Sequence, residues 1–122
     1  MCGTRFLSGV KANVQAAKGF DDVVLYRKGR QAVYIKHVFM NKLPAKVKPD
    51  MSAQNIEFIK QLDTLNLRCY VLVHVKNKLP GEHDLAFFLD DYEAIQGVSK
   101  EVAMQRTMPL ASATHLIDTI LL

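Results

Sequence analysis

The sequence has no long apolar run and no recognisable leader, and both absences narrow the class of protein. A membrane-spanning helix needs about 18 or more consecutive apolar residues, and no such run occurs. The N-terminus lacks a charged segment followed by an apolar stretch and a cleavage site, which is the pattern of a secretory signal. We therefore expect a protein without membrane contact that resides in the cytoplasm or elsewhere inside the cell.

Metal-binding and disulfide motifs are also scarce. Cys2 and Cys69 are the only cysteines, too few for a disulfide scaffold, and their spacing matches no zinc or redox motif. The four histidines show no ligand spacing such as H-x₃-H. We expect two free thiols and no zinc site.

The positive charge is concentrated in the first part of the chain. With 122 residues and 49% hydrophobic content, the sequence is typical of one domain, 1–122, with a core of its own. Residues 1–50 carry a formal charge of +7, whereas residues 51–122 carry −3. A cationic region of this kind suits a polyphosphate partner, since neutralising phosphates releases counterions. We expect nucleic acid as the partner, with DNA favoured over RNA.

Periodicity and turn residues predict an α/β fold, a small mixed central sheet with flanking helices in the order αββαββαα. The expected elements are a helix over Val10 to Lys18, strands over Phe20 to Arg27 and Gln31 to Phe39, a helix over Ala53 to Leu65, strands over Arg68 to Val75 and Leu85 to Leu89, a helical turn over Asp91 to Gln96, and helices that open at Ser99 and Leu110. A basic loop over Asn41 to Pro49 separates the two halves.

The two strands around Lys28-Gly29 predict a β-hairpin, and the turn determines which side chains face each other. A two-residue loop of Lys28-Gly29 would force a long side chain to positive φ and would place Asp21 opposite Lys36. A three-residue loop that begins at Arg27 places only Gly29 in the left-handed region, at the least cost. We favour the second loop, which sets Asp22 opposite Tyr34 with Lys36 on the same face.

This polar patch resembles the site of a nuclease family. The segments Ala17-Lys18-Gly19-Phe20-Asp21-Asp22-Val23-Val24 and Val33-Tyr34-Ile35-Lys36-His37 resemble the PD-(D/E)xK restriction-endonuclease-like superfamily, whose core is αβββαβ. The resemblance implies metal-dependent phosphodiester hydrolysis with Mg²⁺ or Mn²⁺.

The resemblance also implies roles for individual residues. Asp22 would bind the metal, with Asp21 beside it, and Lys36 would be catalytic. Apart from the resemblance, Tyr34, two residues before Lys36, is a further candidate catalytic residue. The predicted contacts to nucleic acid are Arg27, Lys28, Arg30, His37, Lys42, Lys46 and Lys48.

The sequence departs from the family pattern at the acidic position two residues before the lysine. Tyr34 stands there, and a phenol is a poor ligand for Mg²⁺ compared with a carboxylate. No glutamate precedes Glu57, so an N-terminal helix cannot supply the missing acid.

Two other functions fit many of the same residues. The first is a metal-independent ribonuclease similar to RelE/ParE toxins, in which Arg30, Tyr34, Lys36 and Lys42 would serve attack by a ribose 2′-hydroxyl. The second is an inactive protein-interaction module on this scaffold, either as a homodimer or with another protein, because a fold alone does not guarantee chemistry. Each residue also has an alternative that involves no function. The aspartates would cap a strand, Lys36 would extend along a sheet edge, and Tyr34 would pack across strands.

Overall fold

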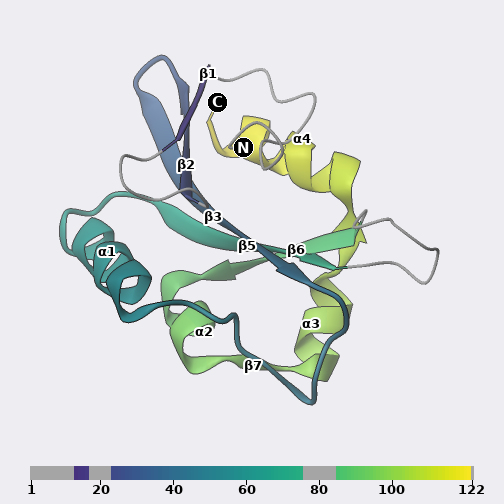
Figure 1. Cartoon of the computed structure of the whole chain (residues 1–122). Coiled ribbons are helices and arrows are strands. Elements are labelled where there is room, and N and C mark those ends of the chain that lie inside the picture. The colour runs from purple at the N-terminus through teal and green to yellow at the C-terminus, as the bar shows by residue number, and fades with distance from the viewer. Residues whose placement is uncertain (1–12, 17–22, 76–84, 122) are drawn as a thin grey trace.

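The computed structural model describes residues 13–16, 23–75 and 85–121 and is a mixed α/β fold (Figure 1). The described strands are β1 (Asn13–Ala16), β2 (Val23–Lys28), β3 (Gln31–Met40), β4 (Lys46–Val47), β5 (Cys69–Val75), β6 (Leu85–Asp90), β7 (Val98–Ser99) and β8 (Met108–Pro109). The described helices are α1 (Ala53–Thr64), α2 (Asp91–Gln96), α3 (Lys100–Arg106) and α4 (Leu110–Ile120). The α/β class predicted from the sequence is confirmed.

One mixed sheet organises these elements, with the strand order β1-β2-β3-β5-β6-β8. β1, β2 and β3 form an antiparallel meander, and β5 then pairs parallel to β3. Because a parallel pair needs a long crossover, the chain passes through β4 and α1 between these two strands. β6 and β8 complete the sheet in antiparallel pairings.

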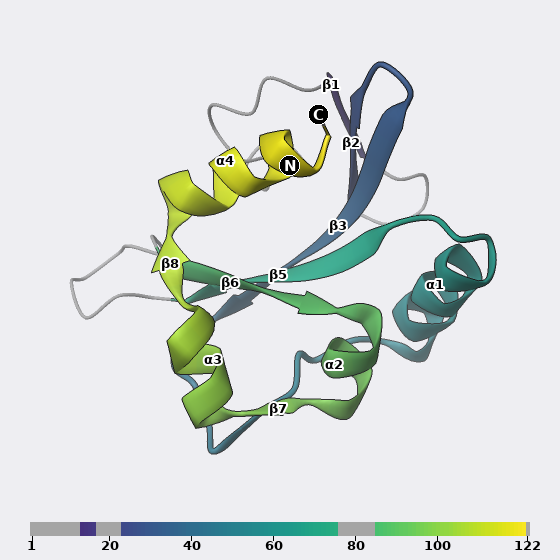
Figure 2. The same ribbon diagram turned by 180° about the vertical axis from the view of Figure 1, so that it is seen from behind.

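Each face of the sheet is covered by helices. α4 covers one face, and α1, α2 and α3 cover the other, as the view from behind also shows (Figure 2). The core under α4 includes Val24, Ile35, Leu72 and Ile117. The core under the other three helices contains Ile59 of α1, Ala94 of α2 and Ala103 of α3, packed with strand residues such as Val71 and Phe87. β5 is therefore buried on both faces, which explains its nearly continuous apolar sequence.

Local capping chemistry sets where several helices begin. The Ser52 hydroxyl accepts a hydrogen bond from the Asn55 backbone N–H at 3.1 Å, and α1 starts at the next residue. At α2, Asp90 and Glu93 form a reciprocal capping box. Ser99 caps α3 in the same way as Ser52 caps α1. These starts agree with the helices predicted from the sequence.

The predicted helix over Val10 to Lys18 is wrong where the structure describes it. Asn13–Ala16 is instead a strand, with Asn13 opposite Arg27 and Ala16 opposite Val24. A short helix gains little on its own because its first turn is costly to nucleate. Pairing with β2 satisfies the backbone of this segment through tertiary contacts that a local pattern does not reveal.

The predicted basic loop over Asn41 to Pro49 is not wholly irregular. Its Lys46–Val47 segment is β4, which pairs antiparallel with β7 in a separate two-stranded sheet. The Lys100 backbone N–H also donates to the Ala45 carbonyl at 2.9 Å. The basic segment is therefore tied to the start of α3.

Candidate functional site

Lys36 and Tyr34 lie on the same face of β3, as the sequence predicts. Lys36 is opposite Val23 on β2 and Val71 on β5, and only 4% of its surface is exposed. Val23 and Val71 are themselves buried, so the lysine stem lies among apolar side chains. Burial of an ammonium group is costly unless the fold compensates its charge, which makes this lysine unusual for a sheet centre.

The register of the β2–β3 hairpin differs from both registers considered above. Lys28 pairs with Gln31, so Gly29 and Arg30 form a two-residue turn. Gly29 has φ of 60°, whereas Arg30 keeps an ordinary φ. A positive φ at the first turn residue alone is the pattern of a type II′ turn, which requires no strained long side chain. The preferred three-residue loop is therefore wrong, while the left-handed Gly29 is confirmed.

The corrected register changes the partners of the site residues. Tyr34 lies opposite Leu25, not Asp22, and Lys36 lies opposite Val23, not Asp21. Asp21 and Asp22, the predicted metal ligands, lie outside the described residues. They immediately precede Val23 in the sequence. In the described ranges, no group of three His, Cys, Asp or Glu side chains is placed to hold a metal ion.

Tyr34 is held by packing. Its ring meets the Phe58 ring of α1 edge-on, with centroids 6.0 Å apart. Its backbone N–H donates to the Arg68 carbonyl at 2.9 Å. The side chain is half-buried, as the alternative of a cross-strand packing role predicts.

His37 and Lys36 lie on opposite faces of β3. Successive strand residues face opposite sides of a sheet, and His37 lies on the α4 side, where 1% of it is exposed. Its Nε2 is 2.9 Å from the Tyr26 hydroxyl, and its Nδ1 is 2.8 Å from His74 Nε2. This burial contradicts the expectation that His37 contacts phosphate beside Lys36.

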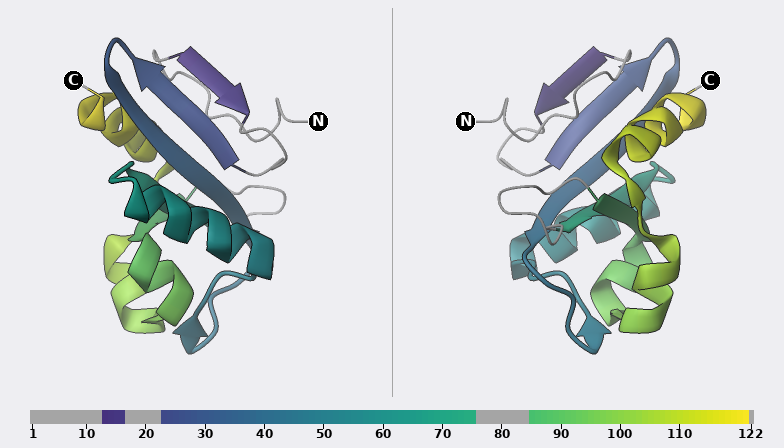
Figure 3. Two further views of the ribbon diagram at one scale, coloured as in Figure 1. Left: turned by 90° about the vertical axis from the view of Figure 1, so that its left-hand side faces the viewer. Right: turned by 90° about the vertical axis from the view of Figure 1, so that its right-hand side faces the viewer.

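The other predicted nucleic-acid contacts are exposed and form two groups. The hairpin-tip cluster consists of Arg27, Lys28 and Arg30. The loop cluster consists of Lys42, Lys46 and Lys48. The ten residues of β3 separate them, and this strand runs from the hairpin tip to the segment that leads to β4 (Figure 3). At about 3.3 Å per residue, β3 alone spans roughly 33 Å.

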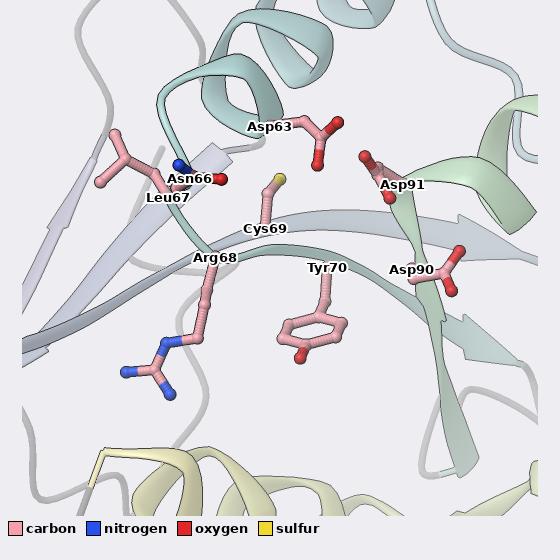
Figure 4. A pocket seen from close by; sticks show the side chains of 8 residues that line it. All are labelled: Asp63, Asn66, Leu67, Arg68, Cys69, Tyr70, Asp90 and Asp91. Atoms are coloured by element: carbon pink, nitrogen blue, oxygen red, sulfur yellow. The ribbon is translucent and has the colours of Figure 1, made fainter.

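A pocket of about 280 Å³ opens at the start of β5, which the sequence did not indicate. Its lining includes Asp63, Arg68, Cys69, Tyr70 and Asp91. In Figure 4, Cys69 and Asp63 lie on the side of α1 and α2, whereas Arg68 and Tyr70 point toward α4. These side chains lie on both sides of the strand and do not converge on one point.

The side chains that line this pocket favour a structural role over a catalytic one. Arg68 donates to the Ile120 carbonyl at 2.9 Å and to Gln31 Oε1 at 2.7 Å, so it joins α4, β3 and β5. Burial, followed by the negative charge of Asp91, raises the pKa of the Cys69 thiol to about 12. A thiol with this pKa stays protonated at neutral pH and is a poor nucleophile.

Sequence reasoning missed the chain of hydrogen bonds through Tyr26, His37 and His74. One signal was present, because His74 interrupts the continuously apolar strand Cys69–Val75. A buried histidine needs a polar partner, which points to a second polar side chain on a neighbouring strand.

Among the described residues, no helix combines the length and apolar character needed to cross a membrane. Comparison of the sequence with models of protein families and with curated proteins found no match.

Proposed function

We propose that this chain is a nucleic-acid-binding domain of the nuclease type, in which Lys36 and the acidic pair Asp21-Asp22 serve metal-dependent phosphodiester hydrolysis. The observation that carries the proposal is the position of Lys36. This buried lysine lies directly opposite Val23, the residue that follows the two aspartates in the sequence.

The order of the elements also supports the proposal. β1, β2 and β3, then α1, then β5 follow one another in the chain, interrupted only by the two-residue β4. This βββαβ order corresponds to the αβββαβ core of restriction-endonuclease-like proteins after its first helix.

The chemistry of the proposed site requires oxygen ligands and a fixed positive charge. Carboxylates are the donors that Mg²⁺ and Mn²⁺ favour, and Asp21 and Asp22 supply two of them. A bound divalent cation would stabilise charge on the phosphate and lower the pKa of a bound water. Lys36 would orient that water and offset charge in the transition state, where a weakly screened ammonium group acts strongly.

The two basic clusters favour duplex DNA as the substrate. Between the hairpin-tip cluster and Lys42 of the loop cluster, β3 spans roughly 33 Å, which is close to one turn of B-DNA, about 34 Å. The hairpin-tip cluster and the loop cluster could therefore contact phosphates one turn apart. A single strand follows no fixed repeat and would not require both clusters.

A second candidate is a binding module that has lost catalysis. Tyr34 stands where the family has an acid, and its ring packs against Phe58 instead of being left for a metal or substrate. Such a module would bind its partner and cleave nothing.

Cleavage assays with the full chain test these functions. We expect cleavage of duplex DNA with Mg²⁺ or Mn²⁺, its loss in EDTA, and its loss on Asp22→Ala or Lys36→Met. Lys36→Met keeps an unbranched side chain in the sheet, and circular dichroism should confirm that the variant folds. Lys60→Ala, at an exposed position of α1, is the matched control and should retain activity.

The other outcomes assign the chain to other classes. Absence of cleavage with either metal would sink the enzyme proposal, and binding without cleavage would favour the inactive module. Cleavage of RNA in EDTA that is lost on Tyr34→Phe would instead identify a toxin-type ribonuclease.

A further inference from the structure

The core under α4 contains a polar contact that the proposed function does not use. Tyr26 on β2, His37 on β3 and His74 on β5 form a continuous hydrogen-bonded chain across three neighbouring strands. All three side chains are buried, at 0%, 1% and 3% exposure. The Phe39 ring stacks on His74 with centroids 4.5 Å apart and planes 15° from parallel, which covers the imidazole further.

The geometry limits how many protons the two imidazoles can carry. His37 Nδ1 and His74 Nε2 are 2.8 Å apart, a distance at which one nitrogen must donate and the other must accept. A neutral pair satisfies this requirement whether His37 carries its hydrogen on Nδ1 or on Nε2. In the first case the Tyr26 hydroxyl donates to His37 Nε2, and in the second case it accepts from it. A pair with one added proton satisfies it as well.

A second added proton removes the acceptor. Each ring of a doubly charged pair would carry a hydrogen on both nitrogens, so two N–H groups would point at each other across 2.8 Å. Two like charges would also face each other in a core that screens them poorly. The hydrogen bond between His37 and His74, which links the side chains of β3 and β5, cannot form in that state.

Several other polar or titratable groups lie on this face of the sheet or on α4, which packs against it. By strand alternation, the face of the pair also carries Tyr26 and Lys28 of β2, Gln31 of β3, Arg68 just before β5 and Tyr70 of β5, while α4 carries Thr114 and Asp118. Thr114 is occupied by the Leu110 carbonyl at 3.1 Å, and Asp118 is only half-buried. β6 carries Ala86, Phe88 and Asp90 at this face, and the Asp90 carboxylate accepts the Glu93 backbone N–H at 2.7 Å.

We propose that the His37–His74 pair is an acid-sensitive lock of the sheet, which holds at most one extra proton and opens β3 from β5 when a second one binds. Because His37 directly follows Lys36 in β3, opening at this point would also displace Lys36. The acid sensitivity would persist in a chain that cleaves nothing, so it is independent of the proposed function.

The sign of the pH dependence follows from counting protons. An imidazole in an unfolded chain has a pKa of about 6.5, so the unfolded state carries protons on both histidines below about pH 5.5. The folded pair carries at most one. The unfolded state then binds at least one more proton, and stability falls as the pH falls, with the unfolding equilibrium constant rising about tenfold per pH unit.

Urea unfolding of the full chain between pH 4.5 and 8 tests the lock. We expect the double variant His37→Leu with His74→Leu to lose this tenfold step per pH unit below about pH 5.5. His115→Gln, at an exposed position of α4, is the matched control and should keep the wild-type pH dependence. Equal pH dependence in the double variant and the wild type would overturn the proposal.

Imidazole NMR of the wild-type chain gives a second test that needs no variant to fold. With ¹⁵N-labelled histidine, we expect the pair to take up no more than one proton while the β3 and β5 amide signals stay native. If both rings become imidazolium and those amide signals do not change, the lock does not exist.

Discussion

Val23 lies directly opposite Lys36 across the antiparallel ladder of β2 and β3. This pairing depends on the two-residue turn at Gly29 and Arg30, because a turn one residue longer or shifted by one position would change every partner. It places Val23, the residue that follows the acidic pair in the sequence, opposite the buried lysine. The proposed site therefore depends on a backbone feature about seven residues away from Lys36.

The two basic clusters should contribute separately to DNA binding. Replacing Arg27, Lys28 and Arg30 by alanine should weaken binding and lower the salt dependence of log K by about 2.7, as expected for three phosphate contacts. The same change at Lys42, Lys46 and Lys48 should have a similar effect. Salt titrations of a 20-base-pair duplex measure both. The Lys60→Ala/Lys100→Ala variant is the control, and equal slopes in all four proteins would contradict the assignment.

The two left-handed glycines should differ in their tolerance of a side chain. A Cβ at Gly29 would meet nothing within 4 Å, so Gly29→Ala should cost about 1 kcal/mol from its φ alone. A Cβ at Gly97 would lie 3.0 Å from Lys46 Cε and 3.2 Å from Lys48 Cβ. Its φ of 86° with ψ of 162° also lies in a region that glycine almost alone adopts.

We therefore expect Gly97→Ala to cost more than about 2 kcal/mol of unfolding free energy. Chemical denaturation of both variants measures the difference. A larger loss in Gly29→Ala than in Gly97→Ala would mean that the β4–β7 contact is not as close as described.

The Cys69 thiol should react slowly in the native chain. Burial, then the charge of Asp91, raises its pKa to about 12, so the folded state favours the neutral thiol. That contribution to stability is complete below the unfolded pKa of about 8.5 and is lost as the pH rises toward 12. In a Cys2→Ser background, iodoacetamide at pH 8 should label native Cys69 at least about 100-fold more slowly than urea-unfolded chain. Comparable rates would show that the thiol is accessible and ionised.

The ion pair between α2 and α3 should give a small stability that depends on acid. Glu93 receives hydrogen bonds from Arg106 at 2.8 and 2.6 Å, and these bonds hold the pKa of its carboxyl below the usual value. Because the folded pKa is lowered, this stability is present above the unfolded pKa of about 4.3 and is lost as the pH falls through the folded value. The Arg106 side chain is 40% exposed, so the pair should contribute under about 1 kcal/mol.

Glu93→Gln isolates that contribution, because glutamine can keep the capping-box contact to the Asp90 backbone. Thermal unfolding of the variant and the wild type should differ at pH 7 and converge near pH 3. A difference that stays constant across this range would assign the effect to the cap and not to the ion pair.

Several elements follow from residues that are close in sequence. Ser52, Ser99 and the Asp90–Glu93 capping box are local hydrogen-bonding arrangements, and each one places a helix start within a residue of the predicted position. The apolar run of β5 predicts its burial for a similar reason, since a strand covered on both faces has no polar positions to alternate. The shared face of Tyr34 and Lys36 follows from strand alternation alone.

Features that depend on contacts between distant parts of the sequence could not be predicted from local patterns. Asn13–Ala16 forms a strand because β2 offers an edge, and a four-residue segment carries too little pattern to reveal that partner. The burial of His37 depends on Tyr26 and on His74, which lies 37 positions further along the chain.

The sequence by itself determined the α/β class, the starts of α1 to α4, the left-handed Gly29 and the alternation that separates Lys36 from His37, because each rests on the conformational preferences of neighbouring residues. Only the tertiary structure decided the hairpin register, the pairing of Val23 with Lys36 and the contact of His37 with His74. Each of these is set by which strands lie side by side, and that arrangement depends on packing both faces of one sheet at once.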